Sequence, residues 1–353
     1  FLKTNKQNAD FLHIGKKLIK WYDTNARQLP WRENQYPYNI WICEILLQQT
    51  QVKQGLGHYL RFIERFPNVE ELHQAPEDEV LLYWKGLGYY SRAINLHKAA
   101  HQIIEEFDGE FPRHYQDILK LKGVGKYTAA AVASICFDEK IPAIDGNFYR
   151  VLSRIFADGF DMSSSRAFQY FTDLALLIMP EDKPGDFNQA IMDVGSEICK
   201  PKNPLCGECP VNDDCIAFQT GRISEFPVKT KKTKVTDLSL KYYFIKYKNQ
   251  FLIKQRGNDF IWKKLYEFPT SVPVEWEELI INSKIINHKL THKNMTIEIN
   301  TIEVESKKEL EKYSSDNDFI IVDEGEADEK SFPKPLENFY KNRTIPETGK
   351  LPF

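Results

Sequence analysis

With 353 residues, the chain is long enough for two domains. Its 42% hydrophobic and 27% charged content is ordinary for a globular protein. The net charge of -3 excludes a globally basic nucleic-acid-binding protein, so any such contact must come from local patches. No apolar run approaches the ~18 residues of a membrane span, and no secretory signal opens the chain. These features predict a cytoplasmic protein without a membrane partner.

The first two thirds of the chain, from about Ala9 to Phe218, show helical periodicity. Apolar residues recur there at three- and four-residue steps, and prolines and glycines separate the periodic segments. The helices predicted from this pattern are 14–21, 41–51, 58–66, 78–84, 91–107, 115–121, 127–137, 147–156, 167–178 and 187–198.

The pattern changes after Gly221. A basic stretch over 226–235 lacks an apolar period and is typical of a linker. Beyond it the residues alternate as strands do. Strands are predicted over 238–247, 251–254, 295–303 and 319–322, with a short helix over 334–341. A smaller mixed α/β part therefore follows a larger all-helical one.

Four of the six cysteines lie within one short segment: Cys199, Cys206, Cys209 and Cys215, with gaps of six, two and five residues. Four thiolates this close can converge on one metal centre, because the loops between them can fold around it. Thiolates suit zinc or an iron–sulfur cluster, and the spacing alone leaves both open. Clustered cysteines indicate a metal site in a reducing compartment and not a disulfide framework.

Two glycines that flank Val124 lie between two predicted helices. Gly123 and Gly125 allow a tight hairpin, and Lys126 begins the next helix. Unpaired N–H groups at such a helix start can bind a phosphate oxygen. The alternative is an ordinary turn between helices.

Two carboxylates stand in settings that suit acid chemistry. Glu44 lies among apolar residues, where burial raises a carboxyl pKa and allows it to act as a general acid. Asp145 precedes a predicted helix, where an N-cap Asp stays ionised. A proton donor opposed to a carboxylate is the pair that cleaves glycosidic bonds. The alternatives are a boundary Glu on an amphipathic helix and a plain helix cap.

These features occur together in an order that resembles the MutY adenine DNA glycosylases, a branch of the endonuclease III-like helix-hairpin-helix superfamily. The resemblance covers roughly residues 10 to 220 and is looser in the C-terminal part. The segments that carry it are 29–32, 41–52, 86–93, 123–127, 145–147, the four cysteines, 266–269, 288–292 and the basic linker.

The resemblance implies a multidomain fold, with an all-α helix-hairpin-helix glycosylase, an iron–sulfur cluster module and a C-terminal α+β Nudix-like domain. The cluster-bearing module is expected over 1–28 and 136–220, and the six-helix module over 29–135. A linker over 221–237 and the Nudix-like domain over 238–353 follow. The family binds a 4Fe–4S cluster at this cysteine spacing. The metal-binding glutamates of the Nudix catalytic box are absent, so this domain should recognise a lesion and not hydrolyse a nucleotide.

The implied activity is that of a monofunctional DNA glycosylase, which removes adenine mispaired with 8-oxoguanine in base excision repair. Glu44 would protonate the flipped adenine, and Asp145 would stabilise the oxocarbenium-like or covalently bound sugar. Tyr127 would support this centre and Asn147 would orient nearby groups. Lyase relatives place a Schiff-base lysine where this chain has Tyr127, which argues against lyase activity.

The resemblance also implies the DNA contacts of a monomeric, nucleoid-associated bacterial enzyme on double-stranded DNA that contains the 8-oxoguanine:adenine mispair. The residues differ in their expected roles. The adenine pocket would be lined by Arg32 and Gln189, and the duplex would be probed by Gln49, Thr50, Leu87 and Tyr89. Phosphate would be bound by Gly123, Gly125 and Lys126. In the C-terminal part, 8-oxoguanine would be read by Thr291 and His292.

Two other functions remain open from the sequence. The first is an endonuclease III-like glycosylase/lyase acting on oxidised pyrimidines, which borohydride trapping would reveal. The second is a non-enzymatic, metal-stabilised DNA-binding module, in which Glu44→Gln would leave function intact.

Overall fold

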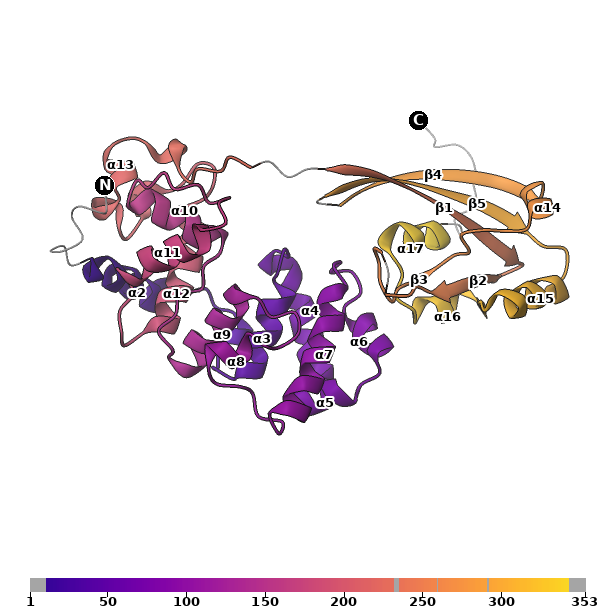
Figure 1. The fold of residues 1–353 in the computed structure, drawn as a ribbon, viewed down its shortest axis with the longest axis horizontal. Helices are drawn as coiled ribbons and strands as arrows, with labels where there is room; N and C mark the ends of the chain where they lie inside the picture. Colours follow the sequence, from indigo (N-terminus) through magenta and orange to yellow (C-terminus); the bar gives the residue numbers. More distant parts are fainter. Residues whose placement is uncertain (1–10, 232–234, 259, 291, 343–353) are drawn as a thin grey trace, which may run out of the picture. The chain divides into compact units, whose positions relative to one another are not determined.

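The computed structural model describes residues 11–231, 235–258, 260–290 and 292–342. The chain divides into two compact units (Figure 1). The first comprises Phe1–Gln74 and Asn95–Lys232, and the second comprises Ala75–Ile94 and Thr233–Phe353. The predicted all-helical part and the predicted mixed part are both confirmed. The finer module boundaries over 1–28, 29–135 and 136–220 stay a prediction.

The described residues of the first unit form helices joined by turns and loops, and no strand. Its α-helices are α2 (Leu12–Asn25), α3 (Pro37–Leu46), α4 (Val52–Arg65), α5 (Val69–Gln74), most of α7 (Ser91–Glu106), α8 (Tyr115–Ile118), α9 (Lys126–Phe137), α10 (Gly146–Ile155), α11 (Ala167–Leu176), α12 (Pro184–Asp193) and α13 (Ile216–Gln219). Short 3-10 or π turns lie at Pro30–Arg32, Val194–Ile198, Cys206–Glu208, Asn212–Asp214 and Ile223–Glu225. Nowhere in the described ranges is a helix both long and apolar enough to cross a membrane.

Two helices, α3 and α12, end five residues earlier than their apolar periodicity predicts. The helix expected over 41–51 ends at Leu46, because Gln49 adopts a φ of 57°, which a right-handed helix cannot contain. The helix expected over 187–198 ends at Asp193 and continues as the π-helical turn Val194–Ile198. Both endings lie next to candidate site residues, where turns aim side chains differently from a continuous helix.

The second unit contains a mixed sheet. Its strands are β1 (Thr236–Tyr247), β2 (Gln250–Gln255), β3 (Tyr266–Glu267), β4 (Ile280–Leu290), β5 (Lys293–Glu303) and β6 (Ile320–Val322). The order is β3-β2-β1-β5-β4, and β6 pairs with β2. β1 and β5 run parallel, with Thr236 beside Lys293, whereas the other pairs are antiparallel.

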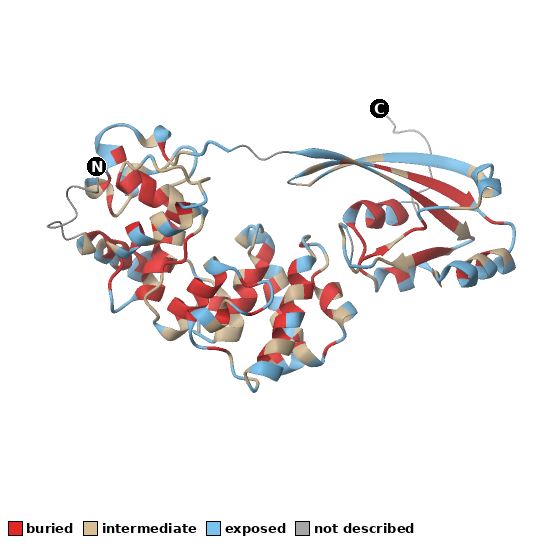
Figure 2. Ribbon diagram, in the orientation of Figure 1, coloured by how far each residue is buried: buried red, intermediate tan, exposed pale blue. Residues whose placement is uncertain are grey.

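Aromatic side chains form the main core of this unit, between the sheet and α17 (Lys334–Lys341). The ring centroids of Phe244 and Phe339 lie 5.5 Å apart, and those of Phe244 and Phe268 lie 4.9 Å apart. Figure 2 shows α17 as largely buried. The remaining helices are α6 (Glu77–Tyr83), α14 (Val274–Glu277), α15 (Lys307–Asn317) and α16 (Glu324–Asp328).

Of the longer elements in this unit, sequence periodicity missed β4 and α15; it also missed the short β3, α14 and α16. β4 has exposed isoleucines, Ile281 and Ile285, so it lacks the alternation that identifies a strand with one buried face. α15 buries only Leu310 and Ser314, so its apolar stripe is too thin to detect. Both elements are identified only by their partners in the fold.

Candidate active site and metal centre

Glu44 lies on α3 in an environment that favours a protonated carboxyl. It has buried apolar neighbours on both sides in sequence, although part of the residue still reaches solvent. Burial is the main cause that raises its pKa to about 7, and the negative charge of Asp145 adds to the rise. A hydrogen bond with Tyr127 opposes it, as does the charge of Arg32. A carboxyl with this pKa holds a proton near neutral pH and can still release it.

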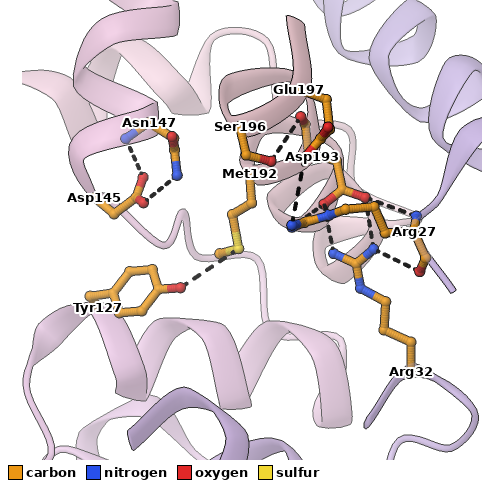
Figure 3. A network of polar contacts seen from close by, with 9 residues as sticks. All are labelled: Arg27, Arg32, Tyr127, Asp145, Asn147, Met192, Asp193, Ser196 and Glu197. Atoms are coloured by element: carbon orange, nitrogen blue, oxygen red, sulfur yellow. Dashed lines mark hydrogen bonds and ion pairs between the residues drawn. The ribbon is translucent and has the colours of Figure 1, made fainter. Parts of the chain in front are cut away.

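Tyr127 lies in the first turn of α9, and its ring points toward the site (Figure 3). Gln48 Nε2 donates a hydrogen bond of 3.3 Å to Thr128 Oγ1, which ties α3 to α9. Burial first, and then the charge of Glu44, raise the pKa of Tyr127 well above its usual range. The hydroxyl therefore keeps its proton; it lies 3.6 Å from Met192 Sδ.

Asp145 caps the N-terminus of α10. Its Oδ1 accepts hydrogen bonds from the backbone N–H of Asn147 at 2.8 Å and of Phe148 at 2.9 Å. Its Oδ2 accepts a third bond, 2.8 Å, from Asn147 Nδ2. Burial nevertheless raises the pKa of Asp145 above its ordinary value, whereas the cap alone predicts the opposite. The three hydrogen bonds counter the burial and stabilise the anion.

Asn147 is held on its other side by Arg150. Arg150 Nη2 donates to Asn147 Oδ1 at 2.8 Å and to the carbonyl of Gly195 at 2.7 Å, and its Nε donates to the carbonyl of Cys199 at 2.6 Å. A Cβ at position 195 would lie 2.6 Å from that of Asn147, so only glycine permits this approach. Asp145, Asn147 and the cysteine segment thus share one hydrogen-bond network.

A second acid, Asp193 at the end of α12, is fully buried and paired with two arginines (Figure 3). Arg32 donates to it through Nη1 at 2.7 Å and Nη2 at 2.9 Å, and Arg27 Nε donates at 2.7 Å. Burial opposes ionisation, yet these bonds and charges lower the pKa of Asp193. The predicted pocket residue Arg32 therefore already carries an ion pair, and Gln189 is half-buried on the same helix as Asp193.

The glycine hairpin has the geometry expected of a phosphate-binding turn. Gly123 has a φ of 76°, and a Cβ there would lie 2.6 Å from that of Asn95. Gly125 is the extended N-cap of α9, and Gly123, Gly125 and Lys126 are all exposed. Exposed N–H groups at the start of a twelve-residue helix are free to face an anion.

The residues predicted to probe the duplex differ in exposure. Gln49 is exposed and Thr50 is partly buried, in the turn after α3. Tyr89 is 43% exposed with a φ of 47°, whereas Leu87 is only 7% exposed. Leu87 is thus packed inside the protein and not presented at its surface.

The predicted lesion-reading loop coincides with the β4–β5 connection. His292 is exposed, and its carbonyl accepts a hydrogen bond of 3.0 Å from the backbone N–H of Thr236. Thr291 lies outside the described residues.

The four clustered cysteines line one cavity of about 270 Å³, which includes space open to solvent. All six cysteines of the chain are free thiols. Among the residues that the structure describes, no group of three His, Cys, Asp or Glu side chains could hold a single metal ion. Four thiolates around one cavity are a ligand set that suits an iron–sulfur cluster or a zinc ion.

Arg154 lies against this cavity and is 3% exposed. Its Nη1 donates to Cys199 Sγ at 3.3 Å and to the carbonyl of Lys200 at 2.8 Å. A buried cation beside a thiolate offsets part of the negative charge that a cysteine-ligated cluster carries.

Sequence reasoning missed Arg150, Arg154 and Asp193. Asp193 did carry a signal, because it is an acid next to the apolar residues Ile191 and Val194. The two arginines carried none, because nothing local distinguishes a buried arginine on α10 from a solvated one.

Three family models match separate parts of the chain. Residues 42–172 match the HhH-GPD superfamily base excision DNA repair protein. Residues 199–215 match the iron–sulfur binding domain of endonuclease III, which confirms the predicted iron–sulfur cofactor and its cysteine segment. Residues 241–342 match the NUDIX domain, which confirms the predicted C-terminal fold.

Curated relatives agree with these matches. The chain is 40% identical over 253 residues to the adenine DNA glycosylase of Buchnera aphidicola subsp. Schizaphis graminum, covering 71% of this chain and 73% of that relative. It is 41% identical over 231 residues to the adenine DNA glycosylase of Rattus norvegicus, of which it covers 45%.

Solved structures resemble the helical part. A thermostable thymine-DNA glycosylase superimposes with a TM-score of 0.55 at 32% identity, over 59% of this chain and 96% of that one. Endonuclease III in a non-covalent DNA complex gives a TM-score of 0.51 at 22% identity, which shows the shared fold. By these matches the chain belongs to the adenine DNA glycosylase family, a family of N-glycosyl hydrolases.

Proposed function

We propose that this protein removes adenine mispaired with 8-oxoguanine from double-stranded DNA, as a monofunctional glycosylase of base excision repair. One observation carries the proposal. Glu44 has a pKa of about 7 and shares its site with the hydrogen-bonded carboxylate of Asp145. These are the proton donor and the anion that cleavage of an N-glycosidic bond requires.

In the proposed reaction, Glu44 donates its proton to N7 of the flipped adenine, so that the base leaves as a neutral molecule. Positive charge then develops on the sugar. Asp145, whose carboxylate already accepts three hydrogen bonds, stabilises that charge or bonds to the sugar until water attacks. Asn147 orients Asp145, and Tyr127 donates to Glu44 after proton transfer.

The residue at position 127 supports the monofunctional reaction. Tyr127 occupies the place where lyase relatives carry the lysine that forms a Schiff base. The neighbouring Lys126 is exposed, and its ammonium lies 4.5 Å from the centroid of the Phe168 ring. This amine is engaged with an aromatic ring at the surface, so an endonuclease III-like lyase is the weaker alternative.

DNA binding is proposed to divide between the hairpin and the probing residues. The exposed Gly123–Lys126 turn binds a backbone phosphate through its N–H groups. Gln49 and Tyr89 enter the duplex beside the mispair, where the Tyr ring replaces a stacked base and lowers the cost of flipping. Leu87 has to leave its buried position to take part.

The Nudix-like part is proposed to read 8-oxoguanine through Thr291 and His292. 8-Oxoguanine differs from guanine by an added carbonyl oxygen and an N7 hydrogen. A hydroxyl can donate to the first and accept from the second. Well-placed contacts of this kind give about 1–3 kcal/mol of discrimination.

The iron–sulfur centre is proposed to have a structural role and to take no part in the chemical step. Cys199, Cys206, Cys209 and Cys215 would hold it, and it would supply the cross-link that fixes the loops between them. Through the bond from Arg150 Nε to the Cys199 carbonyl, the same segment helps to position Asn147. The predicted monomeric state and nucleoid location stay proposals.

The test is single-turnover release of adenine from duplexes that carry 8-oxoguanine, guanine or thymine opposite. We expect the fastest release opposite 8-oxoguanine. Asp145→Asn should lower that rate by at least about 10²-fold, because it removes the anion that faces the cationic sugar. Lesion-duplex binding should be retained. Equal rates with all three partners would reject the specificity, and no release would reject the activity.

A further inference from the structure

The second unit contains an ion pair that joins the end of α6 to α17. Lys85 follows α6, and Glu337 lies on α17. Lys85 Nζ lies 3.3 Å from Glu337 Oε1, with side-chain exposures of 19% and 6%. The same Nζ donates to the carbonyls of Asp328 at 3.1 Å and Lys330 at 3.3 Å. One ammonium therefore satisfies three acceptors near the end of α16 and on α17.

Glu337 also forms ion pairs with two lysines of its own helix. Lys334 Nζ lies 3.0 Å from its Oε2, and Lys341 Nζ lies 3.2 Å from its Oε1. Burial opposes its ionisation, but the bond from Lys334, the charge of Lys85 and the bond from Lys341 together lower its pKa. A buried carboxylate with several lysine partners stays charged, so Lys85 meets a fixed anion.

A second contact holds the start of α6. Gln255 Nε2, at the end of β2, donates 2.8 Å to Asp78 Oδ1, and the Tyr266 hydroxyl donates 3.2 Å to Asp78 Oδ2. α6 is thus attached at both of its ends, at Asp78 and at Lys85. Attachment at two points prevents the helix from rotating about either one.

The loop after Lys85 has three residues with positive φ, and hydrogen bonds from both flanking helices hold it. Gly86, Gly88 and Tyr89 have φ values of 95°, 70° and 47°. Trp84 Nε1 donates 3.2 Å to the Gly88 carbonyl, and Arg92 Nη2 donates 3.3 Å to the same atom. The loop is therefore held by Trp84 and Arg92 through the Gly88 carbonyl, and Lys85 anchors the residue that precedes it.

We infer that Lys85 is a positioning residue, through which the Nudix-like part of the chain sets the conformation of the Gly86–Tyr90 loop and so presents Tyr89 to duplex DNA. This inference rests on the proposed function, because it assigns a task to the loop in base extrusion. Fixing the loop before DNA binds removes an ordering cost from the complex. The part proposed to read the lesion and the loop proposed to act in base extrusion are thereby connected through the contacts of Lys85.

The first measurement needs no DNA. Hydrogen exchange of backbone amides over 84–92 is compared between the full chain and Lys85→Met, which keeps the length of the side chain but removes its charge. We expect exchange in this segment to become at least about threefold faster. Lys85→Arg should restore protection. Lys254→Met is the matched control, because Lys254 also meets a carboxylate, Asp318 at 3.5 Å, and a carbonyl, Asn317 at 3.2 Å.

The second measurement follows base extrusion. In a Glu44→Gln background, 2-aminopurine placed beside the mispair brightens as it unstacks. Lys85→Met should slow this brightening by about 3- to 10-fold, with the catalytic acid already absent. Glu337→Gln should slow it similarly, and the double variant should add little, because both remove the same contact. Lys254→Met should leave the rate unchanged.

Failure of the inference about Lys85 can be distinguished from failure of the proposed function. Unchanged exchange over 84–92 in Lys85→Met overturns the inference, and so does faster exchange with an unchanged unstacking rate. If the wild-type protein releases no adenine, the proposed function fails, whereas the exchange and unstacking measurements still report on Lys85. Thermal midpoints of all variants show whether a slow rate reflects only lost folding.

Discussion

Two acids of the helical unit, the half-buried Glu44 and the fully buried Asp193, have pKa values shifted in opposite directions. Asp193 is enclosed by the guanidinium groups of Arg27 and Arg32, and its pKa is lowered. Glu44 has a hydrogen bond with the Tyr127 hydroxyl, and burial raises its pKa to about 7. The difference shows how a protein separates structural from chemical carboxylates. Counter-charges fix one as an anion, whereas apolar surroundings leave the other with a proton to donate.

The largest effect should come from Asp193→Ala. It leaves Arg27 and Arg32 without their shared anion, in a place where Arg32 is only 12% exposed. Breaking a buried pair in this way costs about 3–5 kcal/mol of unfolding free energy. Urea unfolding measures it, with Lys120→Ala as a control that breaks the exposed Lys120–Asp117 pair. A loss below about 1 kcal/mol would mean that Asp193 is not the structural acid.

Glu44→Gln should lower the excision rate without lowering stability, the reverse of what is expected of Asp193→Ala. Excision should fall by at least about 10²-fold, because the proton donor is gone while the shape remains. Stability should not fall with it. The pKa of Glu44 in the folded protein, about 7, exceeds its ordinary value of 4.5. Ionising Glu44 therefore lowers the free energy of unfolding as the pH rises above 4.5, and Gln cannot ionise. At pH 8 the variant should be more stable by on the order of 1–3 kcal/mol. Excision near the wild-type rate would contradict the acid role.

The pH dependence of excision tests the same contrast without mutation. Because Glu44 must be protonated and its pKa is about 7, the single-turnover rate should fall above pH 7 by about tenfold per unit. Asp193 cannot produce this break, because its pKa is lowered. The measurement is a rate profile at saturating enzyme. A rate that stays constant from pH 6 to pH 9 would show that proton donation by Glu44 does not limit excision.

The smallest effect should come from Tyr127→Phe. The hydrogen bond from Tyr127 lowers the pKa of Glu44, so removing the hydroxyl should raise it. We expect the break in the rate profile to move to higher pH by roughly half a unit to one unit, the scale of one hydrogen bond. A shift to lower pH would mean that Tyr127 assists the protonated form instead.

The sequence by itself determined the kinds of residue at the site and their local settings. An acid inside an apolar run predicts a raised pKa, a Gly-Val-Gly turn before a helix predicts free N–H groups, and four close cysteines predict a metal centre. These predictions depend on interactions within a few residues, so short-range physics was enough for them. The resemblance to a family then selected an iron–sulfur cluster over zinc. Helical and mixed parts were likewise separable, because periodicity is local.

Only the tertiary structure decided which groups meet. Asp193 and Arg32 are separated by 161 residues in the chain and share two hydrogen bonds. Arg150 connects Asn147 to the Cys199 carbonyl, and Lys85 reaches Glu337 across most of the sequence. The strand β4 and the early end of α3 were also missed, because edge strands and turns lack a periodic signal. Long-range pairing depends on the packing of the whole fold, and no local pattern in the sequence encodes it.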